Sequence, residues 1–443
     1  MMDDLYRLSL VDAVRRMASG ELSSERYTQS LLQRIRQVDG AIDAWAHLDP
    51  EAALARAREC DARVRAGRLP GGLQGVPVGV KDLVYTRDMV TSMGSPIYAR
   101  YLPPVNGEVV DRLTTAGAFV IGKTVTTEFA FMTPSKTHNP WNRAHTPGGS
   151  SSGSAAAVAA GMVPVAIGTQ TNGSIIRPAA YCGVVGYKPG KAVLSTEGIL
   201  PFSPALDQPG VFARSVEDAG LLVAHLAHSR WTISPQISAL KHAPRLVATR
   251  TPVWHLASDD QRNRFSTDVA VLRESGAVVD EIELPSSFND AHKVHRTIML
   301  YEAASASRTV REHHAASLSE FLRKSLEEGD RISLSEYERA LKKQEALQRD
   351  FSRFTDDYDA VVTPPATGEA PASLDTTGDP SFCTIWSLLG VPAIVIPTGL
   401  GSSGMPLGMQ IIGNQGESNH LLATSMWCER QLPFRNLLAR EHF

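Results

Sequence analysis

Three residues of the chain have the types and neighbours that nucleophilic catalysis requires. Ser174 closes the turn Thr171-Asn172-Gly173-Ser174, Ser150 lies in GGSSSG, and Lys81 follows the apolar segment VPVGV. A serine hydroxyl attacks a carbonyl carbon when a base takes its proton, and an uncharged lysine is able to act as that base. The chemistry that these residues indicate is acyl transfer through a serine.

The turn that carries Ser174 has a second possible role. Consecutive backbone N–H groups in such a turn converge on one point and can hold an oxyanion, while the hydroxyl lies alongside. Pro178, shortly after, fixes the direction in which the chain leaves. The alternative is an ordinary Gly/Ser turn, and the segment alone does not separate the two interpretations.

Ser150 lies 24 residues before Ser174, and the segment between them predicts a helix over 153–161 and a strand over 163–168. A chain that leaves a sheet as a helix and returns as a strand brings both hydroxyls to one sheet edge. The alternative is a cluster of helix caps, because SSSGSAAAVAA is also good capping sequence. Ser152 is the candidate cap, whereas Ser150 lies further out.

Lys81 terminates a short buried strand expected over 76–80. Burial of an amine disfavours its charged form, so the pKa falls and the neutral, proton-accepting form gains. The alternative is a lysine at a strand end that pairs with Asp82 or extends its amine to water.

Together these segments are similar to the amidase signature family. The segments that carry the resemblance follow the family's order from about residue 8 to 430: GVPVGVKD, GKTVTTEFAF, PGGSSSGSAAAVAAG, GTQTNGSIIRPAAYCGVVGYKP, LDQPGVFARSVEDA and GMPLGMQIIG. The resemblance implies hydrolysis of amides without a cofactor or metal, by a Ser–cisSer–Lys triad. Ser174 is then the nucleophile, Ser150 the bridging serine after a cis peptide bond, and Lys81 the ultimate base. The implied oxyanion hole consists of the backbone N–H groups of Thr171, Asn172, Gly173 and Ser174.

The chain departs from the commonest family pattern around the nucleophile. Gln170 stands where Asp is usual, Asn172 where Gly is usual, and Ile176 where Arg is usual, with Arg177 one position later. This version resembles malonamidase-like members, which act on small amides bearing a carboxylate. Arg177 is therefore a candidate fork for a substrate carboxylate, and the alternative is an arginine bonded to local carbonyls. The same resemblance puts Phe129, Met132, Thr171 and residues 202–208 in the substrate pocket.

Two other functions compete with a free-standing amidase. GAFVIGKT at 117–124 satisfies the Walker A pattern of nucleotide-binding proteins. A helix is expected before Gly117 and a strand after it, whereas a P-loop needs a strand first and then a flexible loop, so the pattern is disfavoured. The family resemblance also allows a glutaminase subunit of a tRNA-dependent amidotransferase, although TQTNGSIIR is not the usual turn of those subunits.

Composition limits the remaining classes of protein. The 443 residues carry a net charge of −3 with both signs mixed, so neither a nucleic-acid footprint nor a polybasic membrane patch is expected. Four separated cysteines without a CxxC pair indicate free thiols and a cytoplasmic protein. Members of the family are often homodimers, which is the assembly that the resemblance implies.

The pattern of apolar residues predicts strands that alternate with helices. Helices are expected over 9–38 (two, separated at Gly20), 50–67, 107–117, 153–161, 259–275, 288–306, 317–328 and 334–355, and the alternation also suggests one over 125–132. Strands are expected over 76–80, 118–122, 163–168, 278–284, 359–365, 392–399 and 409–413. This alternation favours a largely parallel arrangement. The predicted fold is a single α/β/α domain over 1–443, with a large twisted mixed sheet, helices on both faces and a more helical segment at about 260–355.

Overall fold

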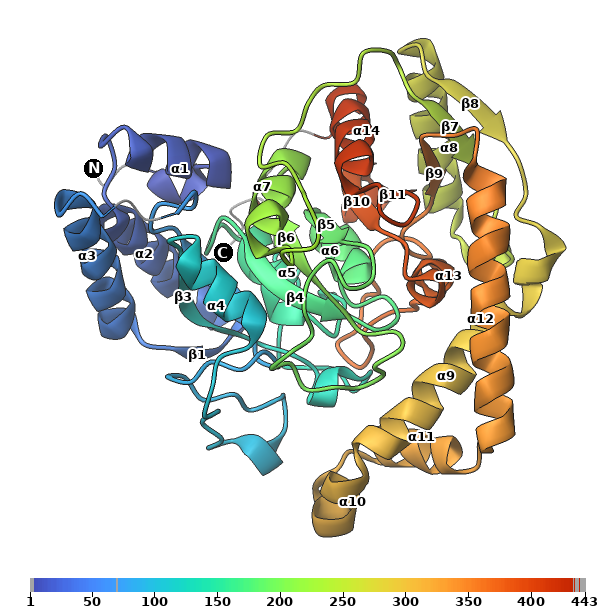
Figure 1. Ribbon diagram of the computed structural model, residues 1–443, viewed down its shortest axis with the longest axis horizontal. Coiled ribbons are helices and arrows are strands. Elements are labelled where there is room, and N and C mark those ends of the chain that lie inside the picture. Colours follow the sequence, from blue (N-terminus) through green and yellow to red (C-terminus); the bar gives the residue numbers. More distant parts are fainter. Residues whose placement is uncertain (1–3, 69–70, 433, 435–437, 439–443) are drawn as a thin grey trace.

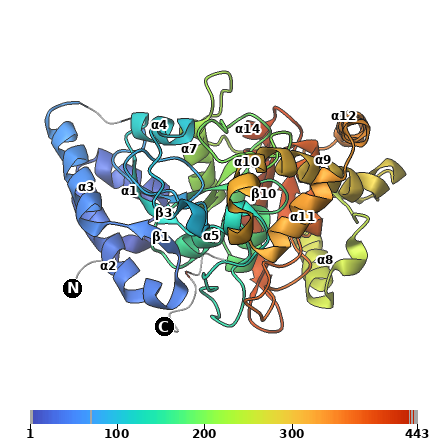
Figure 2. The same cartoon turned by 90° about the horizontal axis from the view of Figure 1, so that it is seen from below.

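A large sheet runs through the computed structural model, which describes residues 4–68, 71–432, 434 and 438. Its eleven strands follow the order β1-β3-β2-β4-β6-β5-β10-β11-β9-β7-β8. Helices lie on both sides of this sheet (Figures 1 and 2). The predicted α/β/α fold with a mixed sheet is confirmed, and the two ends of the predicted domain over 1–443 lie outside the described residues.

The strands pair in both directions. β2 runs parallel to β3 and β4, and β7 runs parallel to β8 and β9. The other pairings between described strands are antiparallel, so the expectation of a largely parallel sheet is wrong. The bounds are β1 (Trp45–Leu48), β2 (Pro77–Lys81), β3 (Phe119–Thr124), β4 (Ala166–Gln170), β5 (Val185–Lys188), β6 (Gln208–Ala213), β7 (Arg245–Ala248), β8 (Val278–Glu281), β9 (Ala360–Thr363), β10 (Ala393–Leu400) and β11 (Pro406–Ile412).

Two apolar cores lie on the two faces of the sheet. One packs side chains of α5, α6, α9, α11, α12 and α13 against the sheet, and the other packs those of α1, α4, α7, α8 and α14. The longer helices are α1 (Leu10–Ala18), α2 (Ser24–Ile42), α3 (Pro50–Arg65), α4 (Glu108–Thr115), α5 (Ser152–Ala159), α6 (Ile176–Cys182), α7 (Val216–Leu226), α8 (Asp259–Glu274), α9 (Ala291–Ala306), α10 (Arg308–His314), α11 (Glu320–Asp330), α12 (Leu334–Thr355), α13 (Ser381–Leu389) and α14 (Ser418–Gln431).

Helix α5 is buried along its whole length, which explains its composition of Ala, Gly and Ser. A Cβ atom on Gly153 would lie 2.3 Å from the Ala44 carbonyl oxygen and 2.4 Å from the Val125 nitrogen, so only glycine fits there. Ser151 stands at the N-cap position, and Ser152 is the first helical residue rather than the cap. The small side chains let α5 pack closely against β2, β3 and β4, whose ends carry the candidate site.

The helical segment that the sequence predicts after residue 259 is present as α8 to α12, and α9 to α12 form an arm at the lower right of Figure 1. The expected helix over 125–132 is wrong, because only the short 3-10 helix Glu128–Ala130 forms there. Phe129 inside it adopts φ 47°, a left-handed angle that no regular helix continues through. β5 and β6 were not predicted, because Gly and Pro interrupt their apolar pattern.

Candidate active site

The amine of Lys81 is buried at the end of β2 and faces two hydroxyl groups. Lys81 Nζ lies 2.7 Å from Ser150 Oγ and 2.8 Å from Thr169 Oγ1. Burial holds the pKa of Lys81 well below its usual range, and the negative charge of Asp207 opposes that shift. A neutral amine in hydrogen-bond contact with a serine is able to accept that serine's proton. Neither pairing with Asp82 nor extension to water describes this lysine.

Ser150 follows a peptide unit whose carbonyl is held by the guanidinium group of Arg177. The Gly149–Ser150 peptide bond is cis, at the position that the family resemblance implies. Arg177 is 3% exposed, and its NH2 nitrogen donates to the Gly149 carbonyl over 2.7 Å. Its NH1 nitrogen donates to the Gly378 carbonyl over 2.6 Å. These contacts are the local-carbonyl alternative that the sequence left open for Arg177.

The turn that carries Ser174 leaves three backbone donors free. In the described part of the chain, the N–H groups of Asn172, Gly173 and Ser174 have no hydrogen-bond acceptor. The next two N–H groups, of Ile175 and Ile176, donate to Gln170 Oε1 over 2.8 and 3.0 Å. The glutamine that replaces the family's usual aspartate therefore closes the turn, and the three free donors are able to hold an anion.

Ser174 is 9% exposed, and no hydrogen bond joins its hydroxyl to Ser150 in the described structure. The structure thus brings Lys81 and Ser150 into contact and places Ser174 on the turn with the free donors. Because hydroxyl contacts in unliganded sites often shorten only when substrate binds, this arrangement is compatible with a relay through Ser150.

Three contacts around the turn come from residues that no sequence motif indicated. Ser387 of α13 donates to the Asn172 carbonyl, and Thr384 Oγ1 donates to Asn172 Oδ1 over 2.7 Å. His295 Nε2 of α9 lies 3.0 Å from the Thr171 carbonyl oxygen. The partners of His295 and Ser387 are separated from them by 124 and 215 positions, and such distant pairs leave no local signal.

A small cavity of about 70 Å³ adjoins the site at Thr169 and Thr171. Its other walls are mostly apolar, and Asp207 contributes a carboxyl group whose pKa is raised by burial. Thr171 Oγ1 donates to Asp207 Oδ1 over 2.5 Å, which ties the turn to this wall.

The cavity tests the pocket residues that the resemblance implied. Thr171 and several residues within 202–208 line it, whereas Phe129 and Met132 are not among its lining residues. Phe129 is buried and packs edge to face on Tyr98, with the ring centroids 6.0 Å apart.

Comparison with known proteins identifies the family. The family model described as "Amidase" matches residues 26–422, which is most of the chain. The chain belongs to the amidase family. It hydrolyses amide C–N bonds, as the family relation and its peptide amidase neighbour indicate.

Two curated relatives of this amidase belong to glutamyl-tRNA(Gln) amidotransferases, of which each is one subunit. The subunit from Symbiobacterium thermophilum is 36% identical, with 94% of this chain and 95% of that protein covered. Its counterpart from Anaeromyxobacter dehalogenans is 32% identical, with 97% of each chain covered. These relatives do not single out malonamidase-like members, so the finer resemblance drawn from the turn is not supported.

Among solved structures, the native peptide amidase of Stenotrophomonas maltophilia is 30% identical to this amidase. It superimposes with a TM-score of 0.83, and the match covers 97% of this chain and 98% of that one. The shared fold therefore extends through both the sheet and the helical arm.

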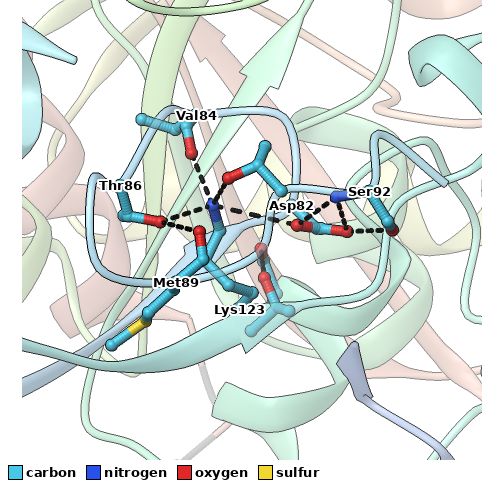
Figure 3. Close-up of polar contacts among 9 residues, drawn as sticks. Asp82, Val84, Thr86, Met89, Ser92 and Lys123 are labelled. Carbon is cyan, nitrogen blue, oxygen red and sulfur yellow. Dashed lines mark hydrogen bonds and ion pairs between the residues drawn. The ribbon is translucent and has the colours of Figure 1, made fainter. Parts of the chain in front are cut away.

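The Walker A pattern of this amidase is part of the sheet. Residues 119–124 form β3, and the Lys123 amine is fully buried rather than free to reach a phosphate. Lys123 Nζ donates to Val84 O over 2.5 Å and to Thr91 Oγ1 over 2.7 Å, and it lies 3.8 Å from Asp82 Oδ1 (Figure 3). The P-loop alternative is wrong, because a strand with a fully bonded lysine cannot wrap a phosphate.

Replacing Lys123 by methionine is expected to destabilise the amidase. The Asp82 carboxylate would stay buried without a cation, at a cost of about 3–5 kcal/mol in the free energy of unfolding. Urea denaturation measures this loss. Lys136→Met is the control, since it removes an exposed partner of Asp43 and should cost less than about 1 kcal/mol. Equal midpoints for the two variants would contradict the assignment.

In the described part of the amidase, no helix is both long and apolar enough to cross a membrane. Within the same residues, no group of three or more His, Cys, Asp or Glu side chains is placed to hold a metal ion. All four cysteines are unpaired thiols.

Proposed function

We propose that this chain is an amidohydrolase in which Ser174 is the nucleophile, Ser150 the bridging serine and Lys81 the base. The observation that carries the proposal is the 2.7 Å contact between Lys81 Nζ and Ser150 Oγ, in a place where burial favours the neutral amine. The position of Ser174 on the turn with three free backbone donors supports its role as the attacking group.

In the proposed reaction, Lys81 Nζ takes the proton of Ser150 while Ser150 Oγ takes the proton of Ser174. Ser174 Oγ then bonds to the amide carbon, and the carbonyl oxygen becomes an oxyanion that accepts hydrogen bonds from the turn. The proton returns through Ser150 to the nitrogen as the C–N bond breaks. The acyl group stays on Ser174 until water, activated by the same relay, hydrolyses the ester.

Release of ammonia or amine from a panel of short amides tests this function. The panel contains propionamide, benzamide, malonamate and glutamine, and each substrate is assayed with the wild type and with Ser174→Ala. The proposal expects ammonia from at least one amide with the wild type alone. It fails if no amide of the panel is hydrolysed, or if Ser174→Ala retains the wild-type rate.

A substrate carboxylate remains the finer proposal for Arg177. Its NH1 and NH2 nitrogens already donate to main-chain carbonyls, whereas its Nε is buried without a partner in the described residues. A carboxylate bound by Arg177 would thus be reached through Nε, with one hydrogen bond rather than a fork. A preference for malonamate over propionamide that Arg177→Lys abolishes would support this role, and equal losses on both amides would exclude it.

A glutaminase subunit is the second candidate, because the two curated relatives described above are subunits of amidotransferases. In that case glutamine would be the preferred amide of the panel, and a partner would increase the rate. Light scattering on the purified chain separates the monomer from the homodimer that the family resemblance implies. Hydrolysis of simple amides by the chain alone, at a rate above that on glutamine, would exclude the glutaminase role.

A further inference from the structure

The free donors of the turn are fixed from behind through their carbonyl groups. A peptide unit is planar, and in its trans form the C=O and N–H groups point in opposite directions. Holding the carbonyl of one residue therefore orients the N–H of the next. The turn has three such units, and each of its carbonyls accepts a hydrogen bond: Thr171 O from His295, Asn172 O from Ser387, and Gly173 O from the Arg177 N–H.

Only one of these three contacts belongs to the local chain. The Arg177 N–H bond to Gly173 O, 2.9 Å long, is the first hydrogen bond of α6 and forms with the helix itself. His295 comes from α9 and Ser387 from α13, so two of the three units depend on distant helices. Both residues are 1% exposed, and water cannot replace them without opening the core.

We propose that His295 and Ser387 are positioning residues, which orient the Asn172 and Gly173 N–H groups toward the oxyanion by donating to the carbonyls behind them. This inference rests on the proposed function, since it assumes that the turn holds the oxyanion. Neither residue touches the reacting atoms. A donor on the carbonyl also polarises the peptide unit and strengthens its N–H as a donor.

The chemistry of His295 suits this role. Since Thr171 O can only accept, Nε2 must carry the hydrogen. Burial lowers the pKa of His295 to about 4, and the neighbouring His292 on the same helix acts in the same direction. The ring therefore stays neutral and keeps this tautomer through the neutral pH range.

Helix α9 is itself tied to the wall of the cavity. Glu302, two turns after His295, accepts hydrogen bonds from Ser203 Oγ over 2.6 Å and from the Ala205 N–H over 2.9 Å. Tyr337 of α12 donates to its other oxygen over 2.6 Å. The helical arm thereby fixes both the cavity wall and, through His295, the turn.

The test compares His295→Leu, His295→Gln and Ser387→Ala. Loss of the donor at either carbonyl is expected to lower kcat by about tenfold to a hundredfold while KM changes by less than about threefold, because the oxyanion forms only after binding. His295→Gln retains an N–H donor and should recover most of the rate. Affinity for a boronic acid, which forms a tetrahedral adduct with the nucleophile, should fall in parallel with kcat.

The matched control is His313→Leu, which removes an exposed histidine of α10 that also contacts a carbonyl, that of Thr309. It should leave kcat and boronate affinity unchanged. If His295→Leu and Ser387→Ala folded with full kcat and boronate affinity while Ser174→Ala was inactive, the positioning role would be wrong and the proposed function would stand. If Ser174→Ala retained activity, the proposed function itself would fail.

Discussion

Replacing Ser174 by alanine is expected to lower kcat by at least about 10⁴-fold, because no other group in the proposed reaction forms the acyl-enzyme. Ser174 is 9% exposed, and its hydroxyl makes no hydrogen bond in the described structure. Its loss should therefore leave the thermal midpoint of unfolding nearly unchanged. Ammonia release under saturating amide, together with a thermal melt, measures both quantities.

Ser151 provides the control for the Ser174 prediction. It is also a buried serine near the site, but its Oγ donates to the Thr169 carbonyl over 3.2 Å and accepts from the Thr169 N–H over 3.3 Å. Ser151→Ala should thus lower stability more than Ser174→Ala and retain a measurable rate. A phosphonate that labels the wild type should label Ser151→Ala and fail to label Ser174→Ala. Labelling of Ser174→Ala at wild-type yield would assign the nucleophile to another residue.

Replacing Lys81 by methionine is expected to lower kcat by at least about 10³-fold, since methionine keeps the length of the side chain and removes the base. The wild type should also show a characteristic dependence on pH. Because burial lowers the pKa of Lys81 and only the neutral amine accepts a proton, activity should rise as pH increases through that pKa and level off above it. The profile of log kcat against pH measures this limb.

Asp207 supplies a control on the origin of that limb. Its negative charge raises the pKa of Lys81 against the effect of burial. Asp207→Asn removes the charge, so the pKa of Lys81 should fall further and the acid limb should move to lower pH. A limb that stays in place in Asp207→Asn, or that persists in the residual activity of Lys81→Met, would mean that a different group titrates.

The sequence determined the family, the elements and the reacting groups of this protein. Lys81 after an apolar strand, Ser150 after two glycines and Ser174 in a Gly-containing turn are local patterns, and the structure places them as expected at the ends of neighbouring elements. The helix over 334–355 was also predicted to the residue, because its periodic apolar face and the Ser333–Glu336 capping box are both local. Periodicity and capping act within one or two turns, which is why they can be read along the chain.

The tertiary structure alone decided the partners of those groups. It separated Lys81, bonded to Ser150 and Thr169, from Lys123, which takes Asp82 as its partner. It turned Arg177 toward main-chain carbonyls and brought the side chains of His295 and Ser387 behind the turn. A hydrogen bond between residues more than a hundred positions apart needs no fixed spacing, so it leaves no periodic pattern in the sequence. Which of several buried polar groups meet is decided only when the sheet and its two helical layers pack together.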